Sequence, residues 1–158
     1  MAIRCRQPQG LALSSQERLE EIHIMKSLLI IAHGSRRLLS NDEVRALTES
    51  IKARVTDTYS SVHCAFLELA EPSIPQGIEL CANDGADEVI VMPYFLSAGR
   101  HVSEDIPSEV SHAQKNHPHL TIRIIDYLGS LPSIPDLIAN QATHAAETCH
   151  ANEEQKTC

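Results

Sequence analysis

The amino-acid sequence predicts an α/β fold: a single domain with a mainly parallel four-stranded sheet and helices on both faces. Short aliphatic runs alternate along the chain with longer amphipathic segments, and this alternation is typical of β-α-β units. The aliphatic runs lack regular polar positions, as expected of strands that helices cover on both sides. The length of 158 residues suits one domain with a core of its own.

Continuous aliphatic runs predict the strands. The first run has the sequence SLLIIA and is bounded by Gly34, and the third is ended by Pro93, which cannot continue a central strand. The predicted strands are 27–32, 63–69, 88–92 and 121–126.

Helical periodicity predicts the connecting segments. From Val44 to Val55 apolar residues recur at spacings of three and four, and Asn41 is a candidate N-cap for that helix. Pro72 and Pro135 lie near the start of their helices and are tolerated there, because the first turn does not use the missing N–H group. Pro107 must lie in the first turn of its helix or it kinks that helix. The predicted helices are 41–57, 72–85, 102–116 and 134–146.

The two ends of the chain differ from this pattern. Residues 1–24 are a predicted N-terminal extension, partly helical, and Met25 is a candidate natural start. Residues 25–146 are predicted to form the α/β domain, and residues 147–158 a flexible polar tail.

Composition excludes several classes of protein. The net charge of −8 and an aromatic content of 3% argue against nucleic acid as a partner, because such binders need a basic surface and stacking platforms. The longest aliphatic run is too short to cross a bilayer, so no membrane partner is expected. The five cysteines are scattered without a CxxC pair, which is typical of reduced thiols in a cytoplasmic protein.

Candidate functional residues gather at the carboxyl ends of the predicted strands, where sheets of this kind bind ligands. This rule selects three loops: 33–40, 68–73 and 94–101. His33 closes the first strand and His101 ends the loop after the third, so the two imidazoles are expected to converge. Two neutral imidazoles suit cobalt, nickel, iron or zinc, and hydrogen bonding within each loop is the alternative role.

Charged residues in the same loops add to this prediction. Glu68 or Glu71 could orient an imidazole, accept a proton or contact a substrate, and each could equally be a solvated loop carboxylate. Arg36, Arg37 and Arg100 indicate an acidic ligand, because guanidinium groups bind carboxylates in bidentate fashion. An ordinary charged surface is the alternative for these arginines.

Three segments together are more specific than any one loop: LLIIAHGSRR, AFLELAEPSIPQGI and VIVMPYFLSAGRHVSEDIP. Over about residues 27–137 they resemble the short, single-domain sirohydrochlorin cobaltochelatases of the CbiX type and the related sirohydrochlorin ferrochelatases. The resemblance implies a chelatase-like domain that inserts Co²⁺ or Fe²⁺ into sirohydrochlorin in cobalamin or siroheme biosynthesis. The divalent metal (Co²⁺, Fe²⁺ or Ni²⁺) is then a substrate, and no prosthetic group is expected.

The resemblance also implies roles for individual residues. His33 and His101 are the expected metal ligands, and His33 is the expected base that accepts pyrrole protons. Glu68, the nearest match to a polar position after the second strand, joins them as a catalytic residue. Arginines such as Arg36 fit the eight carboxylates of sirohydrochlorin. The expected substrate-binding loop consists of Leu96, Ser97, Ala98, Gly99, Arg100 and His101.

Longer relatives of this type contain two such domains, so the resemblance predicts a homodimer in which two copies form one cleft. The alternative function is a non-catalytic carrier of the tetrapyrrole or of the metal on the same fold. A flavodoxin-like module is a third class, and it lacks support because the chain has no phosphate-binding GxGxxG or GxxxxGK[ST] loop.

Overall fold

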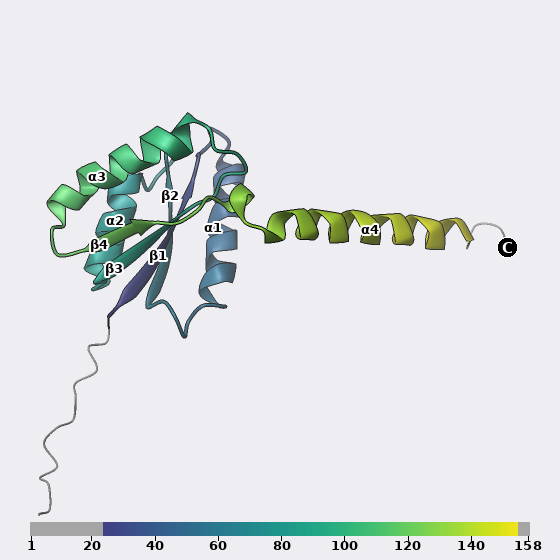
Figure 1. The fold of residues 1–158 in the computed structure, drawn as a ribbon, viewed down its shortest axis with the longest axis horizontal. Coiled ribbons are helices and arrows are strands. Elements are labelled where there is room, and N and C mark those ends of the chain that lie inside the picture. Colours follow the sequence, from purple (N-terminus) through teal and green to yellow (C-terminus); the bar gives the residue numbers. More distant parts are fainter. Residues whose placement is uncertain (1–23, 155–158) are drawn as a thin grey trace, which may run out of the picture.

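The computed structural model describes residues 24–154, and they form an α/β unit from which one helix projects (Figure 1). The predicted N-terminal extension lies outside the described residues apart from Ile24, as do residues 155–158 of the predicted tail. The division of the chain at residue 25 therefore stays a prediction.

All four predicted strands are present and form one parallel sheet. They are β1 (Lys26–Ala32), β2 (Ser61–Phe66), β3 (Glu88–Pro93) and β4 (Thr121–Ile124). The order across the sheet is β2-β1-β3-β4, and each neighbouring pair is parallel. β1 is thus the direct neighbour of both β2 and β3, and the loops that follow these strands leave from the same edge.

Helices cover both faces of the sheet, which confirms the predicted fold class. The helix α1 (Leu38–Lys52) packs against one face, where Ile51 contacts a buried cluster that includes Leu28 and Ile30 of β1. The helices α2 (Ile74–Asn83) and α3 (Ile106–Asn116) cover the other face. There the alternate residues Leu29 and Ile31 are fully buried, and each such side chain contributes about 1.5–3 kcal/mol through burial.

The start of α1 corrects one sequence prediction. The predicted N-cap, Asn41, lies inside the helix, which begins at Leu38 with Arg37 in the cap position. Asn41 is 2% exposed, and its side-chain amide donates a hydrogen bond to the carbonyl oxygen of Ser35 over 2.8 Å. Asn41 therefore connects the helix to the loop after β1, a tertiary role that local capping preferences do not reveal.

The segment before α3 also differs from the prediction. The expected single helix from residue 102 is a π-helical turn, His101–Asp105, followed by α3. Ile106 donates its N–H to the carbonyl of His101, five residues back. Pro107 lies in the first turn of α3, as predicted, and its missing N–H interrupts the regular α-helical pattern upstream.

The last helix, α4 (Ser133–Glu154), follows a short 3-10 turn, Leu128–Ser130, and extends away from the sheet (Figure 1). It continues past the predicted end at residue 146. Leu137 and Ile138 on α4 are 64% and 63% exposed. Within residues 24–154, no helix is long and apolar enough to cross a membrane.

An ion pair connects the end of α2 to the sheet. Asp84 follows the last residue of α2, and its Oδ2 lies 2.7 Å from Nε2 of His63 on β2. The hydrogen bond from His63 lowers the pKa of the Asp84 carboxyl below its ordinary value of 3.8, against a smaller opposing effect of desolvation. The hydrogen bond between His63 and Asp84 stabilises the folded protein. Because the Asp84 side chain is 44% exposed, solvent screening makes this contribution small.

We expect Asp84→Asn to lower the free energy of unfolding near pH 7 by at most about 1 kcal/mol. The lowered pKa makes this contribution complete above pH 3.8, and it is lost as the pH falls through the folded-state pKa. Urea unfolding of wild type and variant at neutral pH and near pH 2 measures the difference. The exposed Asp57→Asn is the control, and a difference that persists at the lower pH would contradict the prediction.

Candidate functional site

The loops after β1 and β2 meet through a close backbone approach at Gly34. Gly34 has φ = +91°, and a Cβ atom at this position would overlap the carbonyl oxygen of Glu68. The N–H of Glu68 donates to the carbonyl of His33 over 3.0 Å, which extends the β1–β2 hydrogen bonding beyond the strand ends. Glycine at position 34 thus lets the two loops hold His33 and Glu68 side by side.

The two histidines at the carboxyl edge of the sheet lie in contact. The ring centroids of His33 and His101 are 4.9 Å apart, and the rings are inclined by 80°. The ring of Phe95, in the loop after β3, lies 6.5 Å from His33 and 6.4 Å from His101. The convergence expected from the sequence is therefore present, with an aromatic side chain beside both imidazoles.

His33 has an oxygen atom near each of its ring nitrogens. Nδ1 lies 3.1 Å from the carbonyl oxygen of Gly34, and Nε2 lies 3.3 Å from Oε1 of Glu68. Both oxygens accept hydrogen bonds, so a hydrogen on either ring nitrogen has an acceptor beside it, and a doubly protonated ring satisfies both. The side chains of His33 and Glu68 are 44% and 51% exposed, so a ligand can reach them.

His101 is held by a carboxylate on its own turn. Nδ1 of His101 lies 2.7 Å from Oδ2 of Asp105, four residues later in the π-helical turn. The other carboxylate oxygen of Asp105 lies 3.7 Å from Nε of Arg100, which also pairs with Glu104 at 3.4 Å. The side chain of His101 is 42% exposed.

The structure distinguishes the two candidate carboxylates after β2. Glu68 faces His33, whereas Oε2 of Glu71 accepts a hydrogen bond from the N–H of Ser73 at the start of α2. The carbonyl of Glu71 also accepts from Arg45 of α1 over 2.6 Å. Glu71 therefore supports the connection between helices, and Glu68 is the carboxylate at the imidazole pair.

The predicted substrate loop and arginines border the histidines on the solvent side. Arg36 and Arg37 are exposed, and the Arg100 side chain is 78% exposed. Residues 96–100 are all exposed. The segment around Gly129 packs against the start of this loop. The N–H of Gly129 donates to the carbonyl of Phe95 over 2.9 Å, and a Cβ at Gly129 would overlap the backbone of Leu96.

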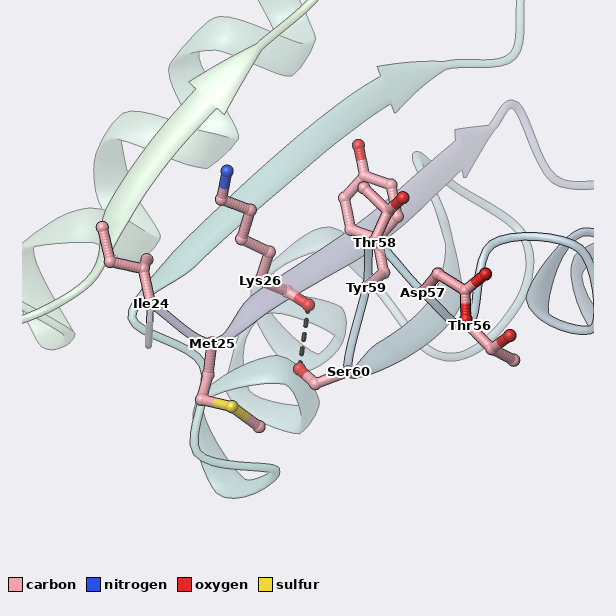
Figure 2. A pocket seen from close by; sticks show the side chains of 8 residues that line it. All are labelled: Ile24, Met25, Lys26, Thr56, Asp57, Thr58, Tyr59 and Ser60. Carbon is pink, nitrogen blue, oxygen red and sulfur yellow. Dashed lines mark hydrogen bonds between the residues drawn. The ribbon is translucent and has the colours of Figure 1, made fainter. Parts of the chain in front are cut away.

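Hollows in the surface lie beside the imidazole pair and at the opposite end of the strands. Two hollows of about 240 and 250 Å³ flank the imidazole pair; His33 and Tyr94 line the first, and His101 and Asp105 line the second. A larger hollow of about 370 Å³ opens beside Lys26, where β1 begins (Figure 2). It contains no imidazole or guanidinium group, so it lacks the candidate residues.

Three residues around the candidate site were not predicted from the sequence. Phe95 and Gly129 carry no local chemical signal, and only the fold brings them to the imidazoles and the loop. Asp105 does carry one, because a carboxylate four residues after a histidine on a helix lies on the same side of that helix. Among residues 24–154, no group of three or more His, Cys, Asp or Glu side chains is arranged to hold a metal ion.

The CbiX family model matches residues 27–145 of the chain. The chain belongs to the CbiX family. It is 36% identical over 117 residues to the chloroplastic sirohydrochlorin ferrochelatase of Arabidopsis thaliana, covering 74% of this chain and 51% of that relative. It is 35% identical over 93 residues to the sirohydrochlorin cobaltochelatase of Methanocaldococcus jannaschii, covering 59% of this chain and 64% of that relative. The chain thus spans between half and two thirds of the length of these CbiX relatives.

Solved structures confirm the chelatase-like fold of this CbiX chain. The sirohydrochlorin chelatase SirB from Bacillus subtilis subspecies spizizenii, solved in complex with cobalt, matches with a TM-score of 0.70 and 29% identity, over 77% of this chain and 51% of SirB. A putative cobalamin biosynthesis CbiX protein from Marinobacter aquaeolei matches with a TM-score of 0.65 and 25% identity. That match covers 78% of this chain and 98% of the Marinobacter chain.

We expect Gly34→Ala to destabilise the protein more than Gly85→Ala, although both glycines have positive φ values of +91° and +83°. Each substitution adds about 1–2 kcal/mol of backbone strain. At Gly34 the new methyl group also overlaps the Glu68 backbone, whereas nothing lies within 4 Å of a Cβ at Gly85. Urea unfolding measures both losses, and equal losses would contradict the close approach at Gly34.

Proposed function

We propose that the protein is a sirohydrochlorin chelatase, which inserts Co²⁺ or Fe²⁺ into the macrocycle. The observation that carries this proposal is the pair of imidazoles at an exposed edge of the sheet, with ring centroids 4.9 Å apart. A carboxylate oxygen of Glu68 lies 3.3 Å from Nε2 of His33 in this pair. The relatives named as cobaltochelatase and ferrochelatase support the reaction type.

The metal ion is proposed to be a passing substrate. His33 and His101 supply two nitrogen ligands, which suit Co²⁺, Fe²⁺ and Ni²⁺ alike. The absence of a third side-chain ligand grouped with them among the described residues leaves positions on the ion for water and for pyrrole nitrogens. Such incomplete coordination favours transfer of the ion over storage.

Proton removal is proposed to fall to His33 and Glu68. Sirohydrochlorin loses two pyrrole protons when the metal enters. Nε2 of His33 lies 3.3 Å from Oε1 of Glu68, so a proton accepted by this pair lies between the imidazole and a carboxylate that can receive it. Because metal binding and proton transfer compete for this nitrogen, His101 is the better placed of the two to keep the metal.

The surroundings of the imidazoles fit a flat, acidic macrocycle. Large apolar side chains that are 39–75% exposed follow β1, β2 and β3 at this edge, and exposed apolar groups on this scale are typical of binding surfaces. They are Leu38, Leu39, Leu69, Tyr94 and Leu96. We propose that these residues and the loop positions Ser97, Ala98 and Gly99 face the rings, while Arg36 and Arg100 bind carboxylates.

The second candidate function is a carrier of the tetrapyrrole or of the metal without catalysis. The half-exposed surface around His33 would also suit a carrier. A carrier of the macrocycle has no use for a base, so the pairing of His33 with the Glu68 carboxylate favours the enzyme. We propose a cytoplasmic location for the protein, because its five cysteines are scattered without a CxxC pair, as is typical of reduced thiols.

Metallation of sirohydrochlorin by Co²⁺ or Fe²⁺, followed by absorbance, tests the proposal. We expect wild type to accelerate the reaction, and His33→Ala and His101→Ala each to slow it by about 10²-fold or more. His112→Ala, which removes an exposed imidazole on α3, should leave the rate unchanged. A double His33/His101 variant as fast as wild type would overturn the site. A wild type that binds sirohydrochlorin without accelerating metallation by any of the metals would establish the carrier.

We also propose that the active form is a homodimer. The chain matches 51% of the length of the Arabidopsis relative. One copy offers exposed apolar side chains to a single face of the flat macrocycle, so the other face would be left in solvent. A second copy would supply that second wall about a twofold axis.

Sedimentation equilibrium is expected to give about twice the chain mass of 17.4 kDa. Addition of sirohydrochlorin should shift the equilibrium further toward the dimer, because a ligand between two copies stabilises their association. A monomer that metallates sirohydrochlorin at full rate would contradict the shared cleft.

A further inference from the structure

The two imidazoles of the site have different hydrogen-bonding partners. Nδ1 of His33 faces a backbone carbonyl and its Nε2 faces Glu68. Nδ1 of His101 faces Asp105 over 2.7 Å, and its ring nitrogens have no other hydrogen-bond partner among residues 24–146. The short distance and the ionic partner make the His101–Asp105 contact the stronger of these constraints on ring orientation.

The chemistry of this contact determines where the His101 ring carries its hydrogen. An ionised carboxylate accepts hydrogen bonds and donates none, so Nδ1 must be the protonated nitrogen of a neutral ring. The lone pair is then on Nε2. A neutral imidazole in water favours the opposite tautomer, with hydrogen on Nε2 and a lone pair on Nδ1.

Three features of the chain keep the carboxylate in place. The π-helical turn His101–Asp105 brings the two side chains to the same side across one wide turn. Ile106, the next residue, is fully buried and anchors the end of the turn in the core. Arg100 lies 3.7 Å from the other oxygen of Asp105 and restrains the carboxylate from its other side.

We propose that Asp105 is a positioning residue that presents Nε2 of His101 as the metal ligand of the site. This inference rests on the proposed function, because it assigns the two imidazoles separate tasks within it. His101 binds the incoming ion through a nitrogen whose lone pair is already free, and His33 is left to exchange protons with Glu68. Asp105 touches neither metal nor macrocycle, and it acts through His101.

The tautomer can be measured without macrocycle or metal. Long-range ¹H–¹⁵N NMR of the metal-free protein should show hydrogen on Nδ1 of His101 in wild type. We expect Asp105→Ala to shift the ring toward the Nε2–H form. Asp105→Asn should retain the Nδ1–H form, because its amide oxygen can still accept. Glu104→Ala, which removes the other carboxylate paired with Arg100, is the matched control and should behave as wild type.

The consequence for the metal is measured by titration with Co²⁺. Loss of an outer partner of a metal-binding histidine weakens affinity by about 10–100-fold, and we expect this of Asp105→Ala. Asp105→Asn should lose less Co²⁺ affinity than Asp105→Ala, and Glu104→Ala should bind Co²⁺ as wild type does. Asp105→Ala that keeps the Nδ1–H form, or that binds Co²⁺ as tightly as Glu104→Ala, would overturn the inference. If Asp105→Ala does not fold, an Nε2–H ring in Asp105→Asn would overturn it.

Failure of the two proposals can be told apart. If wild type binds Co²⁺ with the Asp105 dependence above but does not accelerate metallation of sirohydrochlorin, the proposed function fails and the role of Asp105 stands. If wild type accelerates metallation and Asp105→Ala matches it in tautomer and in Co²⁺ affinity, the chelatase stands and the positioning role is wrong.

Discussion

The parallel pairing of β1 with β3 is the constraint on which the site depends. The strands align from Lys26 opposite Glu88 to Ile31 opposite Pro93, so their following loops start side by side. Burial of alternate residues such as Leu29 and Val91 on one face sets this register, because a slip by one residue would turn the apolar set to the wrong face. This alignment brings the loops of His33 and His101 together, and the centroids of the two rings lie 4.9 Å apart.

The sequence was sufficient to predict the fold and the convergence of His33 and His101 because both depend on strong, simple signals. Unbroken aliphatic runs identify buried parallel strands, and connection rules then bring their carboxyl ends to one edge. His33 directly follows β1 and Glu68 lies two residues beyond the end of β2, so their proximity follows from the parallel pairing of these strands. The resemblance to CbiX chelatases rested on the same loops, and the family match over residues 27–145 confirms it.

Other features depend on contacts that local sequence does not encode. Asn41 has the chemistry of a helix cap, yet it is buried and bonded to Ser35, because the loop after β1 folds back against α1. The interruption of the helix before Pro107 follows from a missing N–H, but this missing N–H does not by itself predict a π-helical turn at His101–Asp105. The direction of α4 is similarly undetermined by periodicity, which predicts a helix and not where it packs.

Two histidines in contact need not be equivalent, and their different partners support the proposal that they perform two competing tasks. A base must give up its proton again, so a half-exposed ring between a carbonyl and a half-exposed carboxylate suits that role. A metal ligand must keep its lone pair free, so a ring fixed at Nδ1 by an ionised carboxylate suits the other. The distinction comes from which oxygen faces which nitrogen, and it is created by the different backbone geometries of the Gly34 loop and the His101–Asp105 turn.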